Sequence, residues 1–106
     1  MAMNGALSVI AEPRRLEILR LVWDREMAAG DIAGRFEVTF GAISQHLGVL
    51  REAGLVAVRR VGKKRMYRAR RESLGALAPA LESMWAERLG TLKRLAEEQE
   101  LRDGDR

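Results

Sequence analysis

The 106-residue sequence contains no cysteine and a single histidine, His46. The lack of cysteine excludes disulfide bonds and thiolate metal or redox sites, and one imidazole cannot form a histidine cluster within a subunit. No apolar run reaches the roughly 18 residues of a membrane-spanning helix, and the N-terminal residues lack the basic segment of a secretion signal. We therefore expect a single domain over residues 1–106, located in the cytoplasm, with no cofactor, no metal and no membrane partner.

Positive charge is concentrated in one segment of the chain. The 13 residues from Arg59 to Arg71 include eight basic side chains and no acidic one, whereas the rest of the chain carries eleven basic and fifteen acidic residues. Such segregation points to a polyanionic partner such as nucleic acid. The alternative is a surface strand whose charges only keep the protein in solution.

Residues 39–53 form the helix around which the other segments are arranged. Thr39 is a good N-cap because its hydroxyl can accept a bond from a free backbone N–H of the first turn. Gly54 stands where a left-handed residue would close the helix. One side is predicted to be an apolar stripe with 3- and 4-residue spacing, made of Phe40, Ile43, Leu47 and Leu50.

The opposite side of this helix is short, polar and nearly flat. Its residues are Gly41, Ser44, Gln45, Gly48 and Glu52. Two glycines inside a helix lower its stability by about 1 kcal/mol each relative to alanine. Their lack of a side chain is an advantage only if another molecule must come close to the helix. A helix in the DNA major groove has that need, and serine and glutamine can reach base edges there. The alternative is an amphipathic core helix that happens to contain glycines.

Three shorter helices are expected before it, over residues 6–11, from Pro13 to about Trp23, and over residues 29–35. The second has a wide apolar face that includes Leu16, Leu19 and Trp23. The third is joined to helix 39–53 by a tight connection. Two helices in this order, the second with a flat polar face, form a helix-turn-helix pattern.

After Gly54 the sequence predicts a β-hairpin. Residues 55–61 are rich in β-branched side chains, residues 62–64 form a turn, and residues 65–69 return. A single hairpin is marginal alone, so it must pack on the helices, through Val56, Val58 and Tyr67. A basic hairpin directly after a helix-turn-helix is a wing, whose tip reaches the DNA backbone or the adjacent minor groove.

Residues 73–100 are predicted to be a long helix, either kinked at Pro79 or beginning near Ala78. Its apolar stripe is longer than so small a domain can cover. We expect the same helix of a second subunit to cover it, although packing within the chain is the alternative. The predicted dimer contacts combine this helix with the first one and comprise Leu7, Ile10, Leu81, Met84, Trp85, Leu89, Leu92 and Leu95.

The order of these segments resembles the ArsR/SmtB-type winged-helix repressors over about residues 6–100. The matching sequence segments are Glu12-Pro13-Arg14-Arg15-Leu16 with Ile18-Leu19, Ile43-Ser44-Gln45-His46-Leu47 with Leu50, Ala53-Gly54-Leu55-Val56, and Gly62-Lys63-Lys64-Arg65 with Tyr67. The resemblance implies a mostly α fold of about five helices with a two-stranded wing. It also implies a homodimeric transcription repressor that dimerises through its terminal segments, about residues 6–23 and 74–100.

Metal-sensing members of that family use cysteines near the third helix, or histidine and carboxylate pairs on the last helix. The corresponding region here, residues 26–31, has no cysteine, and the last helix has Glu82 and Glu87 but no histidine. The C-terminal Trp85, followed by Arg88-Leu89 and Leu92, is similar to a branch of this family without cysteine metal sites. The carboxylate spacing gives a hard cation no support.

His46 lies at the edge of the apolar stripe, where it either bonds a neighbouring element or contacts a phosphate or base. No spacing suggests a catalytic arrangement around it, so we do not expect an enzyme. The predicted DNA contacts are Thr39, Gly41, Ser44, Gln45, His46, Gly48, Arg60, Lys63, Lys64, Arg65 and Arg68.

The expected function is a dimeric regulator, a repressor, that binds double-stranded DNA at an inverted-repeat operator. The alternatives are a protein-binding winged-helix module and a metal-responsive repressor with atypical ligands. A protein-binding face should carry exposed aromatic or large apolar anchors, and we expect none on the flat face of helix 39–53. The sequence specifies neither the operator, nor the regulated genes, nor an effector.

Overall fold

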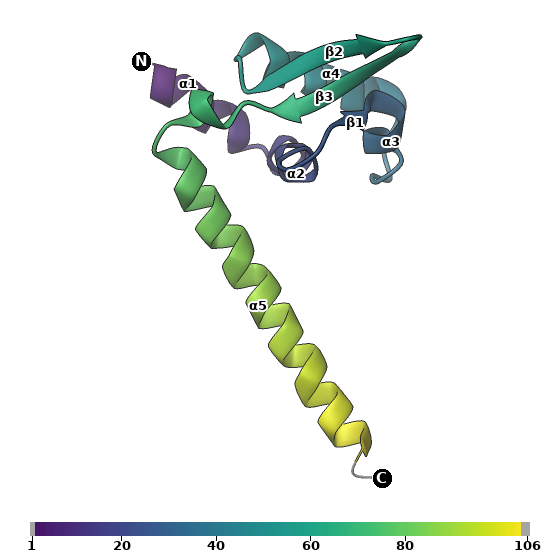
Figure 1. Ribbon diagram of the computed structural model, residues 1–106, viewed down its shortest axis with the longest axis vertical. Helices are drawn as coiled ribbons and strands as arrows, with labels where there is room; N and C mark the ends of the chain where they lie inside the picture. The colour runs from purple at the N-terminus through teal and green to yellow at the C-terminus, as the bar shows by residue number, and fades with distance from the viewer. Residues whose placement is uncertain (1, 105–106) are drawn as a thin grey trace. The chain divides into compact units, whose positions relative to one another are not determined.

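The computed structural model describes residues 2–104, with side chains for residues 5–100. The chain forms two compact units, Met1–Gly75 and Ala76–Arg106. The fold is mostly helical, with five α-helices and a small antiparallel sheet, as predicted (Figure 1). The first unit contains α1 (Ala2–Ile10), α2 (Pro13–Leu21), β1 (Met27–Ala28), α3 (Ala29–Ala33), α4 (Phe40–Glu52), β2 (Val56–Val61), β3 (Lys64–Ala69) and the 3₁₀ segment η1 (Arg71–Leu74).

The core of the first unit is made by the apolar faces of its helices. Its fully buried side chains are Ile18, Leu19, Val22, Ile32, Ile43, Leu47, Leu50 and Leu55. Three of the four residues of the predicted stripe on α4 are among them. Phe40 is the exception, because 57% of its surface is exposed. It occupies the first helical position, at one edge of the stripe, so the predicted stripe is not buried over its whole length.

Both ends of α4 are closed as the sequence predicts. The Thr39 hydroxyl accepts a hydrogen bond from the backbone N–H of Ala42 at 3.1 Å. At the other end Gly54 has φ +76°, its N–H donates to the carbonyl of Arg51, and the N–H of Leu55 donates to the carbonyl of Leu50. These two bonds form a Schellman motif, which satisfies the last carbonyls of the helix and turns the chain into β2.

The helices before α4 differ from the expected ranges mainly at their ends. The first helix begins at Ala2 and not near Ala6, and α2 and α3 end about two residues earlier than predicted. α2 begins at Pro13, and the Glu12 carboxylate accepts a hydrogen bond from the N–H of Arg15 at 2.9 Å. A carboxylate in this position satisfies a free N–H group and interacts favourably with the helix dipole.

The sheet contains one strand that the sequence did not reveal. Its strand order is β1-β3-β2, with Met27 opposite Tyr67 and Val58 opposite Tyr67 on the other side. Tyr67, in the middle strand, is buried, as is Val56, and Val58 is half-buried. The predicted packing residues of the hairpin are thus confirmed as its inward side.

Two backbone hydrogen bonds fasten the base of the hairpin to the helical part of the first unit. The N–H of Ala69 donates to the carbonyl of Val22 at 2.9 Å, and the N–H of Arg70 donates to the carbonyl of Leu55 at 2.8 Å. Figure 1 shows the hairpin of β2 and β3 extending from this base toward a free tip.

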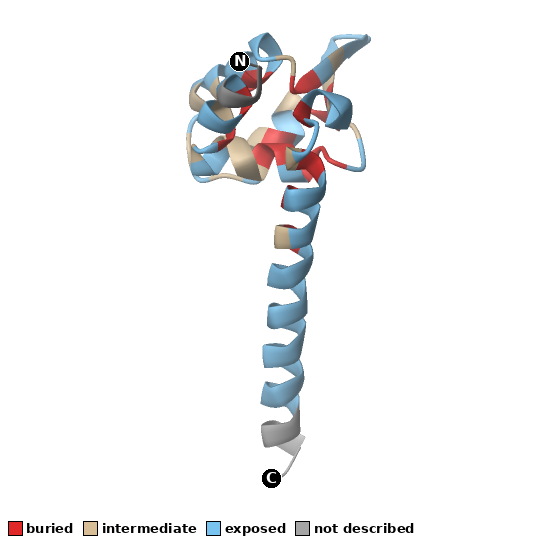
Figure 2. Cartoon of the chain, turned by 90° about the vertical axis from the view of Figure 1, so that its left-hand side faces the viewer, coloured by how far each residue is buried: buried red, intermediate tan, exposed pale blue. Residues whose placement is uncertain are grey.

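The second unit is the single helix α5 (Leu77–Gly104). Pro79 is its third residue, in the first turn, where the missing N–H would have no partner within the helix. Of the two alternatives that the sequence left open for this helix, the one in which it begins close to Ala78 is therefore confirmed. Figure 2 shows α5 exposed along most of its length. Among the described residues, no helix is both long and apolar enough to cross a membrane.

Gly54→Ala should destabilise the first unit, because an L-residue in the left-handed region costs about 1–2 kcal/mol. Gly48→Ala should have the opposite effect. Gly48 lies inside α4, and a Cβ built there meets no atom within 4 Å, so alanine should add about 0.5–1 kcal/mol to the free energy of unfolding.

Urea unfolding followed by circular dichroism measures both changes on the same helix. The Gly48→Ala variant serves as the control for a methyl group added to α4. Equal unfolding midpoints for the two variants would contradict the proposed role of Gly54 in ending the helix.

Candidate nucleic-acid interface

The exposed face of α4 is defined by the burial of its other face. Ile43, Leu47 and Leu50 point into the core, and the helix packs on α2 and α3. The residues on the outer side, Gly41, Ser44, Gln45 and Gly48, are all exposed. The structure thus brings these four predicted contact residues together on one accessible surface.

Neither glycine of this face is required by the packing of the chain itself. A Cβ at Gly48 would meet nothing within 4 Å, and one at Gly41 would meet only the Thr39 hydroxyl at 3.9 Å. Both glycines lower helix stability without a compensating contact inside the molecule. Contacts within the described part of the chain therefore do not account for either glycine.

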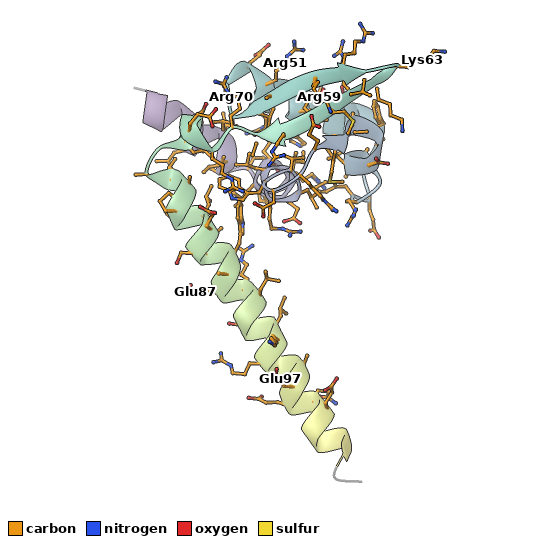
Figure 3. All side chains as sticks on the ribbon, in the orientation of Figure 1. Arg51, Arg59, Lys63, Arg70, Glu87 and Glu97 are labelled. Carbon is orange, nitrogen blue, oxygen red and sulfur yellow. The ribbon has the colours of Figure 1, made fainter. Side chains whose placement is uncertain are left out.

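The hairpin tip is built on a two-residue loop, Gly62-Lys63. Gly62 has φ +62°, and no other residue of the loop has a positive φ, which is the pattern of a type II′ turn. Figure 3 shows the Lys63 side chain at this tip. Arg60 on β2 lies directly opposite Arg65 on β3, so two like charges share one face of the hairpin, an arrangement that is unfavourable without an anion nearby.

Three of the eight basic residues between 59 and 71 are held by carboxylates. Arg59 forms two hydrogen bonds with Glu26, at 3.0 and 2.7 Å. Arg70 pairs with Glu72 at 3.3 Å, and Arg71 pairs with Asp24. The hydrogen bond from Arg59 lowers the pKa of Glu26 below its usual range. These three guanidinium groups are therefore partly neutralised within the chain.

The other five basic residues have no carboxylate within 4 Å in the part of the chain that the structure describes. They are Arg60, Lys63, Lys64, Arg65 and Arg68. All five are exposed, and all five were predicted as DNA contacts. The predicted contacts leave out Arg59 and Arg71. Their carboxylate partners could not be found from the sequence, because Glu26 and Asp24 lie more than 30 positions earlier.

A cleft of about 500 Å³ joins α4 to the hairpin. Its α4 wall includes Phe40 and Ser44, and its hairpin wall includes Lys63, Lys64 and Arg65. The hairpin wall is thus cationic, the α4 wall is apolar with one hydroxyl group, and Asp31 of α3 is the acidic residue of the lining. Phe40 is the member of this site that the sequence analysis missed, because the helical spacing assigns it to the apolar stripe and not to the flat face.

Thr39 and His46 are engaged within the protein. The Thr39 hydroxyl caps α4, as described above. His46 is half-buried, and its Nδ1 lies 3.5 Å from Nη1 of Arg15 and 3.8 Å from the Glu12 carboxylate. Arg15 also donates from Nε to the carbonyl of Val9 at 2.7 Å. His46 therefore faces α2, as the first of its two alternatives proposed, and not the open side of α4.

The predicted dimer contacts differ in exposure. Leu7 is 49% exposed, and Leu89, Leu92 and Leu95 are between 55% and 65% exposed. Ile10, Leu81 and Trp85 are buried in a single chain, and Met84 is half-buried. Among the described residues there is no group of three histidine, aspartate or glutamate side chains arranged to hold a metal ion.

Comparison with known proteins places the chain among bacterial regulators. Residues 12–58 match the family model described as bacterial regulatory protein, arsR family. The chain is 32% identical over 81 residues to the transcriptional activator HlyU of Vibrio cholerae, covering 76% of this chain and 75% of that protein. It is 38% identical over 61 residues to the transcriptional repressor SdpR of Bacillus subtilis, covering 58% and 68% of the two chains.

The fold agrees with these sequence matches. The solved structure of HlyU from Vibrio cholerae N16961 superposes with a TM-score of 0.73 at 30% sequence identity, covering 80% of this chain and 92% of that one. The relatives named here thus include both an activator and a repressor.

Proposed function

The chain belongs to the arsR family of bacterial regulatory proteins, and from this we propose that it acts as a homodimeric repressor of transcription at an inverted-repeat operator. As a member of that family it is a DNA-binding transcriptional regulator and not an enzyme. In our proposal α4 enters the major groove, and the hairpin of β2 and β3 contacts the backbone or the adjacent minor groove.

The observation that carries the proposal is the combination of a flat exposed face on α4 with a basic hairpin, of which Lys63, Lys64 and Arg65 line a cleft shared with α4. Serine and glutamine on that face have the donors and acceptors needed to read base edges. Gly41 and Gly48 leave room for the helix to approach the groove floor. Gln45 is the best candidate for direct readout, because its amide can donate and accept together at adenine N6 and N7.

Two arginines that lie opposite each other on one face of the hairpin support a phosphate contact. Arg60 and Arg65 repel each other in the free protein, and a phosphate group between or beside them would relieve that repulsion. Lys63 and Lys64 extend the positive surface to the tip. Such contacts fix the position of a protein on DNA without carrying sequence information.

Dimerisation is proposed through the terminal helices. Leu89, Leu92 and Leu95 recur every three residues on α5 and leave large apolar side chains in water. Burying them against a second copy would stabilise both chains. Leu7 on α1 is the exposed candidate at the other end of the chain.

Repression is the proposed direction of regulation. A dimer bound over a promoter excludes the polymerase from it, and the relative SdpR is named as a repressor. The two-fold axis of the dimer would present two α4 helices to successive major grooves, about 34 Å apart. An operator with inverted symmetry follows from that geometry.

Selection of bound fragments from a random DNA library tests the proposal. The wild type should enrich an inverted repeat with half-site centres about one helical turn apart. Gln45→Ala should relax the preference at one base position per half-site, at a cost of about 1–3 kcal/mol each. Glu97→Ala truncates an exposed side chain on the side of α5 away from Leu89, Leu92 and Leu95, and it should return the wild-type motif. A motif without inverted symmetry, or a motif unchanged by Gln45→Ala, would contradict the proposed docking of α4 in the major groove.

Lys64→Ala should weaken binding to every DNA sequence, because a phosphate contact is not sequence-specific. The slope of log K against log salt should become shallower by about 0.9 for each phosphate that a subunit no longer neutralises. Arg59→Ala removes the same charge from the same hairpin, but its partner is Glu26, so it should leave the slope nearly unchanged. Salt titrations by fluorescence anisotropy measure both variants. Equal slopes for Lys64→Ala and the wild type would remove Lys64 from the interface.

Replacing both Leu89 and Leu92 by glutamate should yield a monomer that binds the operator weakly. Light scattering should give about twice the mass of one chain for the wild type and a single-chain mass for the variant. Arg94→Glu changes the net charge by the same two units on the opposite side of α5, and it should stay dimeric. An unchanged mass for the double variant would refute dimerisation through α5.

A further inference from the structure

Phe40 is the most exposed large apolar side chain among the described residues of the first unit, at 57%. Its exposure is not a fraying effect, since the Thr39 cap bonds the first turn of α4 and holds the residue in place. A phenylalanine kept in water by a well-formed helix end is available to another molecule. The question is which molecule its surroundings fit.

The position of Phe40 relates it to the proposed DNA interface. It is the first residue of α4, and Ser44 lies one turn later on the same side. Both line the cleft whose other wall carries Lys63, Lys64 and Arg65. In helix-turn-helix proteins the N-terminal residues of the second helix contact the base edges. Phe40 therefore stands where base edges would arrive, between the readout face and the cations.

The chemistry of the ring selects among the bases. In the major groove only thymine presents an apolar group, its C5-methyl, whereas guanine, adenine and cytosine present donors and acceptors. Phenylalanine offers no hydrogen-bonding partner, so a polar base edge pressed against it would lose its bond to water. A methyl group against the ring is favourable, because both surfaces leave water.

The cations of the cleft disfavour an apolar protein segment as the occupant. Three of its lining residues are basic against one acidic residue, Asp31, and none of the three basic residues has a carboxylate within 4 Å among the described residues. A partner must therefore supply negative charge and an apolar group a short distance apart. A DNA strand does so, with its phosphates at the hairpin and a thymine methyl at Phe40.

We propose that Phe40 is a specificity-determining residue, which reads one thymine per half-site through its 5-methyl group. This inference rests on the proposed docking of α4 in the major groove. It adds an apolar contact to the polar readout assigned to Gln45, from a residue that the sequence pattern places in the core.

Replacement of thymine by uracil tests the contact, because it removes the methyl group and nothing else from the major groove. Each thymine of the enriched operator is replaced in turn, and the affinity is measured by fluorescence anisotropy. For the wild type, one replacement per half-site should weaken binding about fourfold, the factor expected for one buried methyl group. Phe40→Ala should bind the thymine operator more weakly and should show no further decrease in affinity with uracil.

Two further variants keep the test specific. Phe40→Leu retains an apolar side chain and should retain part of the dependence on the methyl group. Val49→Ala truncates an exposed apolar residue on the opposite side of α4 (38% exposed), and it should respond to uracil as the wild type does. Circular dichroism should show that all three variants are folded.

Each outcome has one meaning. Equal sensitivity of the wild type and Phe40→Ala to every uracil, or no sensitivity at all, overturns the assignment while the proposed function stands. The ring would then serve another contact, such as an acidic protein segment. If the wild type enriches no motif from the random library, the docking of α4 fails, and this inference fails with it.

Discussion

Burial of the apolar stripe of α4 is the interaction on which the rest of the structure depends. Ile43, Leu47 and Leu50 are almost fully inaccessible, and their removal from water fixes the rotation of the helix about its axis. Once that rotation is set, Ser44 and Gln45 must face outward, and both glycines lie on the same open side. The cap at Thr39 and the Schellman motif at Gly54 then fix where this face begins and ends.

The position of the hairpin follows from the same core. Tyr67 is buried between its two neighbouring strands, and the end of β3 is bonded to the carbonyls that follow α2 and α4. Because the base of the hairpin is attached to these helices, its unpaired cations stay beside the open face of α4. Carboxylates neutralise Arg59 and Arg71. Four of the five remaining basic side chains lie in the half of the hairpin nearer the tip: Arg60, Lys63, Lys64 and Arg65.

Features that depend on neighbouring residues were predictable from the sequence, and those that depend on distant ones were not. The caps of α4, its stripe and the hairpin turn arise from residues a few positions apart. The two-residue strand β1 has no periodicity to detect, and the pairs Arg59–Glu26 and Arg71–Asp24 join distant segments. Phe40 shows what helical periodicity cannot predict. The spacing assigns the residue to the apolar side of α4, but it does not tell whether another element covers the first turn of the helix.

The central claim is that α4 occupies the major groove in two copies related by two-fold symmetry. Methylation interference on the selected operator addresses it most directly, because dimethyl sulfate modifies guanine N7 in the major groove and adenine N3 in the minor groove. Our account predicts that guanine N7 methylation blocks binding in two successive major grooves on one side of the duplex, about 34 Å apart. Interference confined to adenine N3, or to a single major groove, would contradict it.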